Sequence, residues 1–422
     1  MCQQFMKTLT GIIFLAIALL FQACSFTRAM LYWSPNITDH KIFQHTEMLP
    51  GDNIFGFKQG ILNDNTTNAI DSLVKATTTT AFIIIRNDSV LFEKYYRGYK
   101  RDSISKNFSI SKSITSLLTG IAVDEGYIES VQDPVTKYIP ELKKKNPKFE
   151  QLTIEHLLNM RAGFKFNEDN YFPLSKATRL YYGTNHLGKI KRAKFKYEPG
   201  EVHEYQSLTT ALLGVVVEKA IGKNLSEYAQ EKIWIPLGME NRATWDIDDK
   251  RHHSNRAHVG VNATAIDLAK IGRLYLNHGI WNGEQIVSAD WVAKSTTPDI
   301  NYLGYQYHWW SYEDRIAKTP PVIKGDQYLF SLESLFPDSI SARQYAKEKY
   351  PESKFVEPVS IKYKKSKLWY LGISPNEDCQ FAAEGILHQW IFVDPKKDII
   401  IVRLGEKLDT PSTFIRHLIS RL

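Results

Sequence analysis

Serine and lysine residues at the spacing Ser-x-x-Lys are the groups of this chain with the clearest chemical potential. The pattern occurs three times, as Ser72 with Lys75, Ser103 with Lys106, and Ser109 with Lys112. In a helix, residues three positions apart lie on one face, so such a lysine can reach the serine hydroxyl. A serine becomes a strong nucleophile when a neighbouring base takes its proton, and a lysine serves as that base only if burial lowers its pKa.

The surrounding sequence favours Ser109 and Lys112 among these pairs. Apolar residues recur after Ser109 at helical spacing, at positions 110, 114, 117, 118 and 121. Ser103 and Lys106 stand in a polar stretch that predicts a loop, and no serine has the glycine-flanked setting of the α/β-hydrolase nucleophile. One alternative stays open, in which Ser109 only caps the helix and Lys112 is a solvated surface residue.

Residues 108–128 resemble the nucleophile helix of the β-lactamase-related serine hydrolases. This family includes class C β-lactamases, D-alanyl-D-alanine carboxypeptidases, family VIII esterases and 6-aminohexanoate-dimer hydrolases. Further segments agree with it in order between residues 75 and 405, namely 152–163, Pro199-Gly200, Pro236-Leu237-Gly238-Met239, 265–272 and 279–283. The resemblance implies a serine hydrolase with Ser109 as nucleophile and Lys112 as its base, and it implies no cofactor.

The family's second motif, Tyr-x-Asn or Tyr-x-Ser, is matched by Tyr205-Gln206-Ser207. The resemblance implies that Tyr205 shares the proton relay with Lys112, taking the serine proton and returning it to the leaving group. Ser207 is a candidate for substrate binding and is equally suited to cap the helix that follows it. Tyr205 as a packing residue is the alternative.

The family's third motif, Lys-Thr-Gly, is absent from this chain. Residues 383–390 stand in its place and resemble the Gly-x-x-Gly-Gln segment of the aminohexanoate-hydrolase branch. His388 and Gln389 are therefore candidates for substrate binding, although His388 suits a place against the sheet equally well. A backbone N–H of this segment, together with that of Ser109, is expected to form the oxyanion hole, and the sequence does not identify the donor. Loss of the motif's lysine argues against recognition of a β-lactam or peptide carboxylate.

Two strand pairs around short turns, at 81–96 and 389–404, lie near opposite ends of the chain, with helical periodicity between them. This arrangement predicts an α/β fold in which an antiparallel sheet, flanked by helices, is assembled from segments far apart in sequence. The hydrolase domain is expected at 66–422, with a helical subdomain at about 120–290 and an irregular insertion at about 312–380. The substrate cleft is expected between sheet and subdomain.

The N-terminus carries an export signal, because Lys7 is followed by an apolar run over residues 9–21 and then by Ala23-Cys24. We expect residues 1–23 to be a lipoprotein-type signal peptide, Cys24 to be lipidated, and residues 24–65 to form an extended lead-in around the core. An uncleaved N-terminal anchor is the alternative. Both place the protein in the bacterial cell envelope, membrane-attached and facing the periplasm.

Composition excludes several classes of protein. The chain has 422 residues, 43% of them hydrophobic, and 53 Lys and Arg against 46 Asp and Glu without a basic stripe, which argues against nucleic-acid binding. Its three cysteines form no disulfide or zinc framework. The histidines His252, His253 and His258 lack an acidic partner at ligand spacing and predict a polar loop, so no metal is expected.

Taken together, the sequence predicts an exported serine hydrolase that cleaves a small amide or ester through an acyl-enzyme on Ser109. A cell-wall D-peptide carboxypeptidase or a β-lactamase is the enzymatic alternative. The alternative from another class is an envelope-binding protein that has lost catalysis. The expected partners are a small-molecule or peptide substrate and, through the lipid anchor, the membrane.

Overall fold

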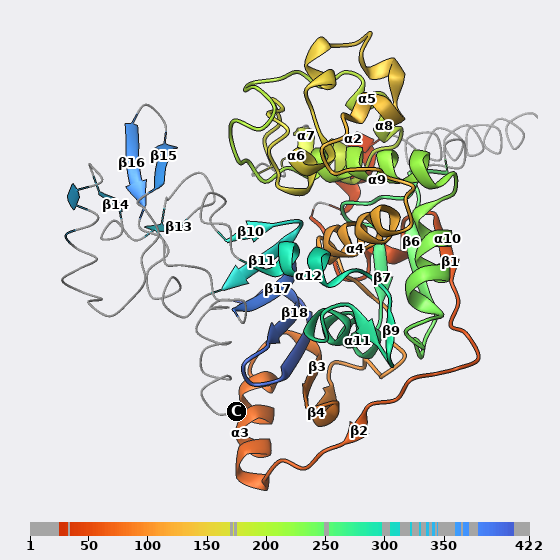
Figure 1. Ribbon diagram of the computed structural model, residues 1–422. Helices are drawn as coiled ribbons and strands as arrows, with labels where there is room; N and C mark the ends of the chain where they lie inside the picture. Colours follow the sequence, from red (N-terminus) through yellow and green to blue (C-terminus); the bar gives the residue numbers. More distant parts are fainter. Residues whose placement is uncertain are drawn as a thin grey trace, which may run out of the picture.

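The computed structural model describes residues 25–32, 34–168, 172, 175–248, 253–297, 304–312 and 379–408, with short pieces between (321–322, 329–330, 335–336, 340–341, 344, 359–363 and 366–370) (Figure 1). The predicted signal peptide, Cys24 and most of the predicted insertion lie outside these residues.

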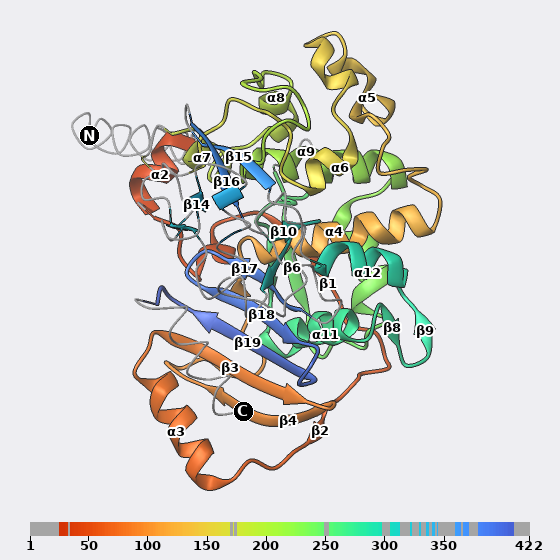
Figure 2. The same cartoon turned by 60° about the vertical axis from the view of Figure 1, so that its left-hand side comes forward.

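An eight-stranded sheet forms the centre of the described structure (Figure 2). Its strands, in spatial order, are β10 (Tyr305–Gln306), β11 (Trp309–Tyr312), β17 (Gln380–Gly385), β18 (Gln389–Asp394), β19 (Ile399–Gly405), β3 (Thr79–Arg86), β4 (Ser89–Tyr95) and β2 (Lys58–Gln59). All neighbours run antiparallel except β2 and β4, which are parallel.

Both predicted hairpins are present in this sheet. β3 and β4 are joined at Asn87 and Asp88, whose positive φ angles of 49° and 54° suit a two-residue hairpin turn. β18 and β19 form the second hairpin, and β19 pairs with β3, with Val402 opposite Ile83. The prediction of an antiparallel sheet assembled from distant segments is therefore confirmed.

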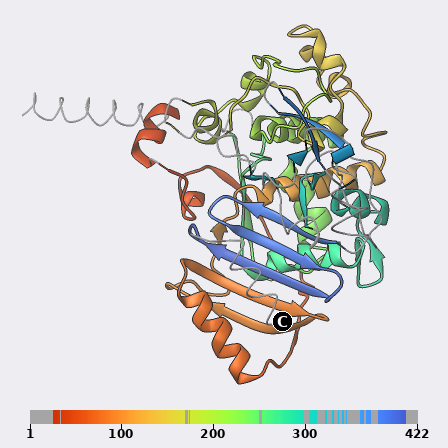
Figure 3. The same ribbon diagram turned by 90° about the vertical axis from the view of Figure 1, so that its left-hand side faces the viewer.

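Helices cover both faces of the sheet (Figure 3). Alternate residues of β3 explain why, since Phe82 and Ile84 join the cluster beneath α3 (Asp64–Lys75), whereas Ile83 and Ile85 join the main core. α11 (Ala265–Leu276) lies on the main-core face.

The remaining helices lie mostly beyond α4 (Ile110–Asp124), toward the top of Figure 1. They are α5 (Val135–Tyr138), η2 (Pro140–Leu142), η3 (Pro147–Glu150), α6 (Ile154–Leu158), α7 (Lys176–Tyr181), α8 (His186–Ile190), α9 (Ser207–Ile221), α10 (Leu225–Ala229), η4 (Gln230–Trp234) and α12 (Ala289–Thr296). The fold predicted from the sequence, a sheet flanked by helices with a helical layer above it, is thus confirmed.

A second sheet of four strands joins the lead-in to the body of the protein. Its order is β1 (His45–Met48), β6 (Ala243–Asp246), β7 (Val261–Ala263) and β5 (Ser105–Lys106). The lead-in also contains α2 (Ser25–Tyr32) and η1 (Asp39–Lys41), so it is more regular than the sequence indicated.

Within the predicted insertion, the described strands β14 (Leu335–Phe336), β16 (Ser366–Tyr370) and β15 (Val359–Tyr363) form a sheet, and β12 (Pro321–Val322) pairs with β13 (Leu329–Phe330). A short hairpin, β8 (Ile280–Trp281) with β9 (Glu284–Gln285), completes the strands.

The small second sheet contains a fully buried ion pair between Lys106 and Asp246. Lys106 belongs to one of the Ser-x-x-Lys patterns, yet its ammonium contacts Asp246 on β6 and the ring of Phe43, at 4.9 Å from the centroid. The backbone N–H of Lys106 donates to the carbonyl of Ile37 in the lead-in. This lysine therefore ties together strands and the lead-in, and it serves no serine.

We expect the substitution Lys106→Met to lower the free energy of unfolding by about 3–5 kcal/mol, because it leaves Asp246 charged and buried without a partner. Urea denaturation followed by circular dichroism measures this change. The matched control is Lys294→Met, whose ion pair with Asp290 is exposed, and its cost should stay below about 1 kcal/mol. Equal effects of the two substitutions would contradict a structural role for the buried pair.

Candidate active site

Ser109 immediately precedes α4, at the junction with β5. Its hydroxyl makes no capping hydrogen bond to the helix, so the alternative in which Ser109 only caps α4 is wrong. The preceding residue, Phe108, is fully buried and has a φ of 49°, a conformation that costs a non-glycine residue about 1 kcal/mol or more. The strained residue turns the chain sharply and presents the Ser109 hydroxyl to the pocket.

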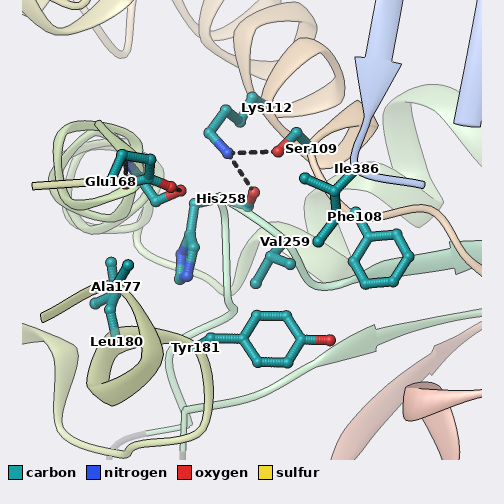
Figure 4. Close-up of a pocket in the computed structure, with 11 residues that line it drawn as sticks. Phe108, Ser109, Lys112, Glu168, Ala177, Leu180, Tyr181, His258, Val259 and Ile386 are labelled. Atoms are coloured by element: carbon teal, nitrogen blue, oxygen red, sulfur yellow. Dashed lines mark hydrogen bonds between the residues drawn. The ribbon is translucent and has the colours of Figure 1, made fainter. Parts of the chain in front are cut away.

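Lys112 lies one helical turn further, with its ammonium fully buried (Figure 4). Its Nζ is 2.8 Å from the Ser109 Oγ and donates to the carbonyl oxygen of His258 at 2.9 Å. Burial lowers the pKa of Lys112 to about 8, while the negative charge of Glu168 acts in the opposite direction. The alternative of a solvated surface lysine is therefore wrong, and Lys112 has the pKa required of a base.

Tyr205 stands beside this pair, with its ring centroid 5.0 Å from the Lys112 Nζ. The ring stacks on Trp310 at 6.1 Å and meets Tyr305 edge-on at 5.6 Å. These two aromatic residues come from β10 and β11, the edge of the main sheet, and they hold the tyrosine against the lysine. The tyrosine of the Tyr-x-Ser motif is therefore in contact with the lysine of the Ser-x-x-Lys motif.

Ser207, the first residue of α9, also lines the pocket. Its hydroxyl donates to Glu168 Oε1 at 2.5 Å, and its backbone N–H donates to Oε2 at 2.9 Å. Sequence analysis did not identify Glu168, because it stands in a loop that matches no motif. The carboxylate places one negative charge in the pocket, near the Lys112 ammonium.

The pocket itself is narrow, with a volume of about 20 Å³, which is room for a water molecule or a small group (Figure 4). Its polar lining consists of Ser109, Lys112, Glu168, Ser207 and His258. Its apolar lining consists of Phe108, Ala177, Leu180, Tyr181, Val259 and Ile386. Polar groups that could take part in a reaction and apolar side chains therefore both line the pocket.

His258 corrects a prediction, since the sequence indicated a polar loop and the structure buries this residue to 2% exposure. Its ring packs against His186 at 5.2 Å between centroids, and neither of its ring nitrogens has a hydrogen-bond partner among the described residues. Burial, followed by the charges of His186 and Lys112, holds the pKa of His258 well below its usual range. The imidazole is therefore neutral and free to bond a group in the pocket.

The end of β17 completes the pocket. A Cβ on Gly385 would lie 2.5 Å from the carbonyl oxygen of Asn107, so only glycine allows the strand this close to the chain entering Ser109. The next residue, Ile386, lines the pocket.

His388 and Gln389 do not line the pocket, although the sequence made both of them candidates for substrate binding. His388 packs beside Trp390, and its Nδ1 accepts a hydrogen bond from the Leu408 N–H at 2.9 Å. The side-chain amide of Gln389 donates to the carbonyl oxygens of Gly405 at 2.6 Å and Ile386 at 3.3 Å. Both residues therefore fix the turn that carries Ile386.

The lead-in supports the opposite wall. The hydroxyl of Tyr181, whose ring lines the pocket, donates to Asp39 Oδ2 at 2.7 Å in a buried contact. Arg256, also buried, donates to the carbonyl oxygens of Tyr181 at 2.8 Å and Gly183 at 2.7 Å. Sequence analysis did not identify these residues, because their partners are more than 70 positions away.

No group of three or more His, Cys, Asp and Glu side chains that could hold a metal ion occurs among the described residues. Likewise, none of the helices in the described part of the chain is both long and apolar enough to cross a membrane.

Residues 67–419 match the protein family described as Beta-lactamase. The chain is 29% identical over 240 residues to the 6-aminohexanoate-dimer hydrolase of Paenarthrobacter ureafaciens, a match that covers 53% of this chain and 59% of that protein. It therefore spans little more than half the length of that relative.

Solved structures share the fold. One described as "Putative 6-aminohexanoate-dimer hydrolase from Bacillus anthracis" superposes with a TM-score of 0.66 at 22% identity, covering 92% of each chain. A class C β-lactamase in complex with cefoxitin superposes with a TM-score of 0.55 at 16% identity, covering 85% of this chain and 99% of the other. With the family match extending over most of its length, the chain belongs to the beta-lactamase family.

Proposed function

We propose that this protein is a serine hydrolase that cleaves a small amide or ester through a covalent acyl-enzyme on Ser109. The observation that carries the proposal is the contact of 2.8 Å between the Ser109 hydroxyl and a buried lysine whose pKa is lowered to about 8. In the neutral form of Lys112, the amine lone pair accepts the hydroxyl proton while an N–H still donates to the carbonyl of His258.

In the first step, the Ser109 Oγ attacks the substrate carbonyl carbon, and its proton passes to Lys112. Tyr205, next to the same ammonium, relays this proton to the leaving amine or alcohol as the bond to the carbonyl carbon breaks. In the second step, water gives a proton to the same relay and attacks the acyl carbon. The carboxylic acid leaves, and Ser109 regains its proton.

The negative oxygen of each tetrahedral intermediate needs two hydrogen-bond donors. We assign them to the backbone N–H groups of Ser109 and Ile386. Ser109 stands at the N-terminus of α4, where the helix dipole favours negative charge. Ile386 lines the same pocket from the turn that follows β17, and Gly385 brings the end of that strand close to the nucleophile.

The charges that line the pocket disfavour a carboxylate close to the scissile bond. Lys112 is the single cation among the described residues that line it, and the proton relay uses that lysine. Glu168 contributes a negative charge that would repel a substrate carboxylate. An amide or ester without a carboxylate beside the scissile bond therefore fits better than a β-lactam or a D-peptide, both of which carry a carboxylate next to that bond. The likeness to a 6-aminohexanoate-dimer hydrolase supports an amide.

The proposal includes export and membrane attachment. The apolar run at 9–21 and the sequence Ala23-Cys24 support a lipid-anchored protein in the cell envelope, facing the periplasm.

Covalent labelling tests the nucleophile. We expect the protein to gain a single adduct with a fluorophosphonate, mapped to Ser109 by peptide mass spectrometry, because only an activated serine reacts. Ser109→Ala should lose the adduct and at least roughly a thousandfold in kcat/KM toward a simple ester. Ser103→Ala is the matched control, since Lys106 is committed to Asp246, and it should keep both. A folded protein with neither adduct nor turnover would point instead to a binding role without catalysis.

The pH profile tests the base. Because the neutral amine of Lys112 accepts the proton, kcat/KM for a pH-stable ester should rise about tenfold per pH unit below pH 8 and level off above it. Glu168→Gln removes the charge that raises the pKa of Lys112, so the midpoint should move to lower pH. A profile that is flat across this range, or a midpoint that moves upward, would refute Lys112 as the base.

A further inference from the structure

α2, the first described helix, ends in three exposed apolar residues. Met30 is 50% exposed, Leu31 60% and Tyr32 42%. Single exposed apolar side chains are common on protein surfaces, whereas three around the last turn of one helix give it an apolar end that favours an apolar partner.

Covalent geometry identifies the partner. Ser25, which begins α2, directly follows Cys24, and only two residues separate Cys24 from the apolar run at 9–21. A lipid on Cys24 or an uncleaved anchor would each leave the start of α2 at the bilayer surface. A helix of 8 residues is about 12 Å long, so the patch at its far end stays within reach of the bilayer.

The same helix packs against the wall of the catalytic pocket. Tyr32 stacks on Tyr182 at 6.2 Å between ring centroids, just after the end of α7. The neighbouring Tyr181 lines the pocket, as do Ala177 and Leu180 of α7. Figures 2 and 3 show α2 on the same side of the molecule as the turn between β17 and β18, which carries Ile386. One short helix therefore separates the membrane-proximal segment from the reaction site.

From these contacts we infer that α2 lies in the bilayer interface, with Met30 and Leu31 inserted, and that the pocket of Ser109 serves an ester or amide presented at the membrane surface. Tyr32 suits the boundary between lipid and water because its ring is apolar and its hydroxyl is polar. The net charge of +7 favours anionic lipids. This inference rests on the proposed hydrolase activity and membrane attachment. It adds the place where the enzyme binds its substrate, which is the membrane surface.

Spin-label depth measurements test the position of α2. The full-length chain is reconstituted in vesicles of phosphatidylglycerol and phosphatidylethanolamine, with a nitroxide attached through Met30→Cys or Leu31→Cys. Ile61→Cys is the matched control, because Ile61 is an apolar residue with 94% exposure, and labelled wild type gives the background of native cysteines. Labels at 30 and 31 should collide more with oxygen than with a water-soluble nickel complex, and the label at 61 should show the reverse. Equal nickel access at all three positions would overturn the inference.

Kinetics on two forms of one ester test the substrate's location. The double variant Met30→Asp/Leu31→Asp should lose about tenfold in kcat/KM toward a vesicle-embedded ester, because charges resist insertion into the interface. Its rate on the short-chain, water-soluble form should not change, and Ile61→Asp should alter neither rate. Loss on both esters, or on neither, would overturn the inference. If the wild type cleaves no ester, the proposed function fails, while the spin-label result still reports independently on α2.

Discussion

A buried lysine is the constraint on which the rest of this structure depends. Removing the Lys112 ammonium from water is unfavourable, and two acceptors, the Ser109 hydroxyl and the His258 carbonyl, compensate part of the cost. The part of this desolvation cost that the two acceptors do not offset lowers the pKa of Lys112 to about 8, which suits the lysine to the proposed role of base. The helix that follows Ser109, the turn that carries His258 and the loop that carries Glu168 must therefore be held rigidly around one nitrogen atom.

The protein achieves this rigidity by bringing distant segments together. β17 reaches Ser109 because Gly385 has no side chain, and Gln389 fixes the turn that follows. On the opposite side, Asp39 of the lead-in holds Tyr181, and the buried pair of Lys106 and Asp246 fastens the lead-in to the second sheet. A segment that carries no catalytic motif thus forms part of the support of the active site. The same segment places α2, and with it the proposed membrane contact, one helix away from the nucleophile.

Two lysines in similar sequence patterns have opposite roles, and the surroundings of each explain why. Lys106 and Lys112 are both fully buried and both stand three residues after a serine. Lys106 has a carboxylate partner in direct contact, so its charge is neutralised in place. Lys112 has only neutral groups within hydrogen-bond distance among the described residues, so its proton is easily lost. We therefore assign the proposed proton transfer to Lys112 and not to Lys106.

Much of the fold and the centre of the site followed from local sequence patterns. The hairpins at both ends, the helix after Ser109, and the choice of Ser109, Lys112 and Tyr205 required only periodicity, spacing and ordered motifs, because these features are encoded within a few residues of one another. Contacts between distant segments were not predictable in this way. The packing of segments far apart in sequence places His258 and Glu168 in the lining of the pocket, where the sequence did not predict them. The same packing places His388 and Gln389, which the sequence had made candidates, outside that lining. The sequence by itself determined the class of fold and the candidate reacting residues. Only the tertiary structure decided which residues surround them, because packing between distant segments determines which groups are buried, and burial shifts their pKa values.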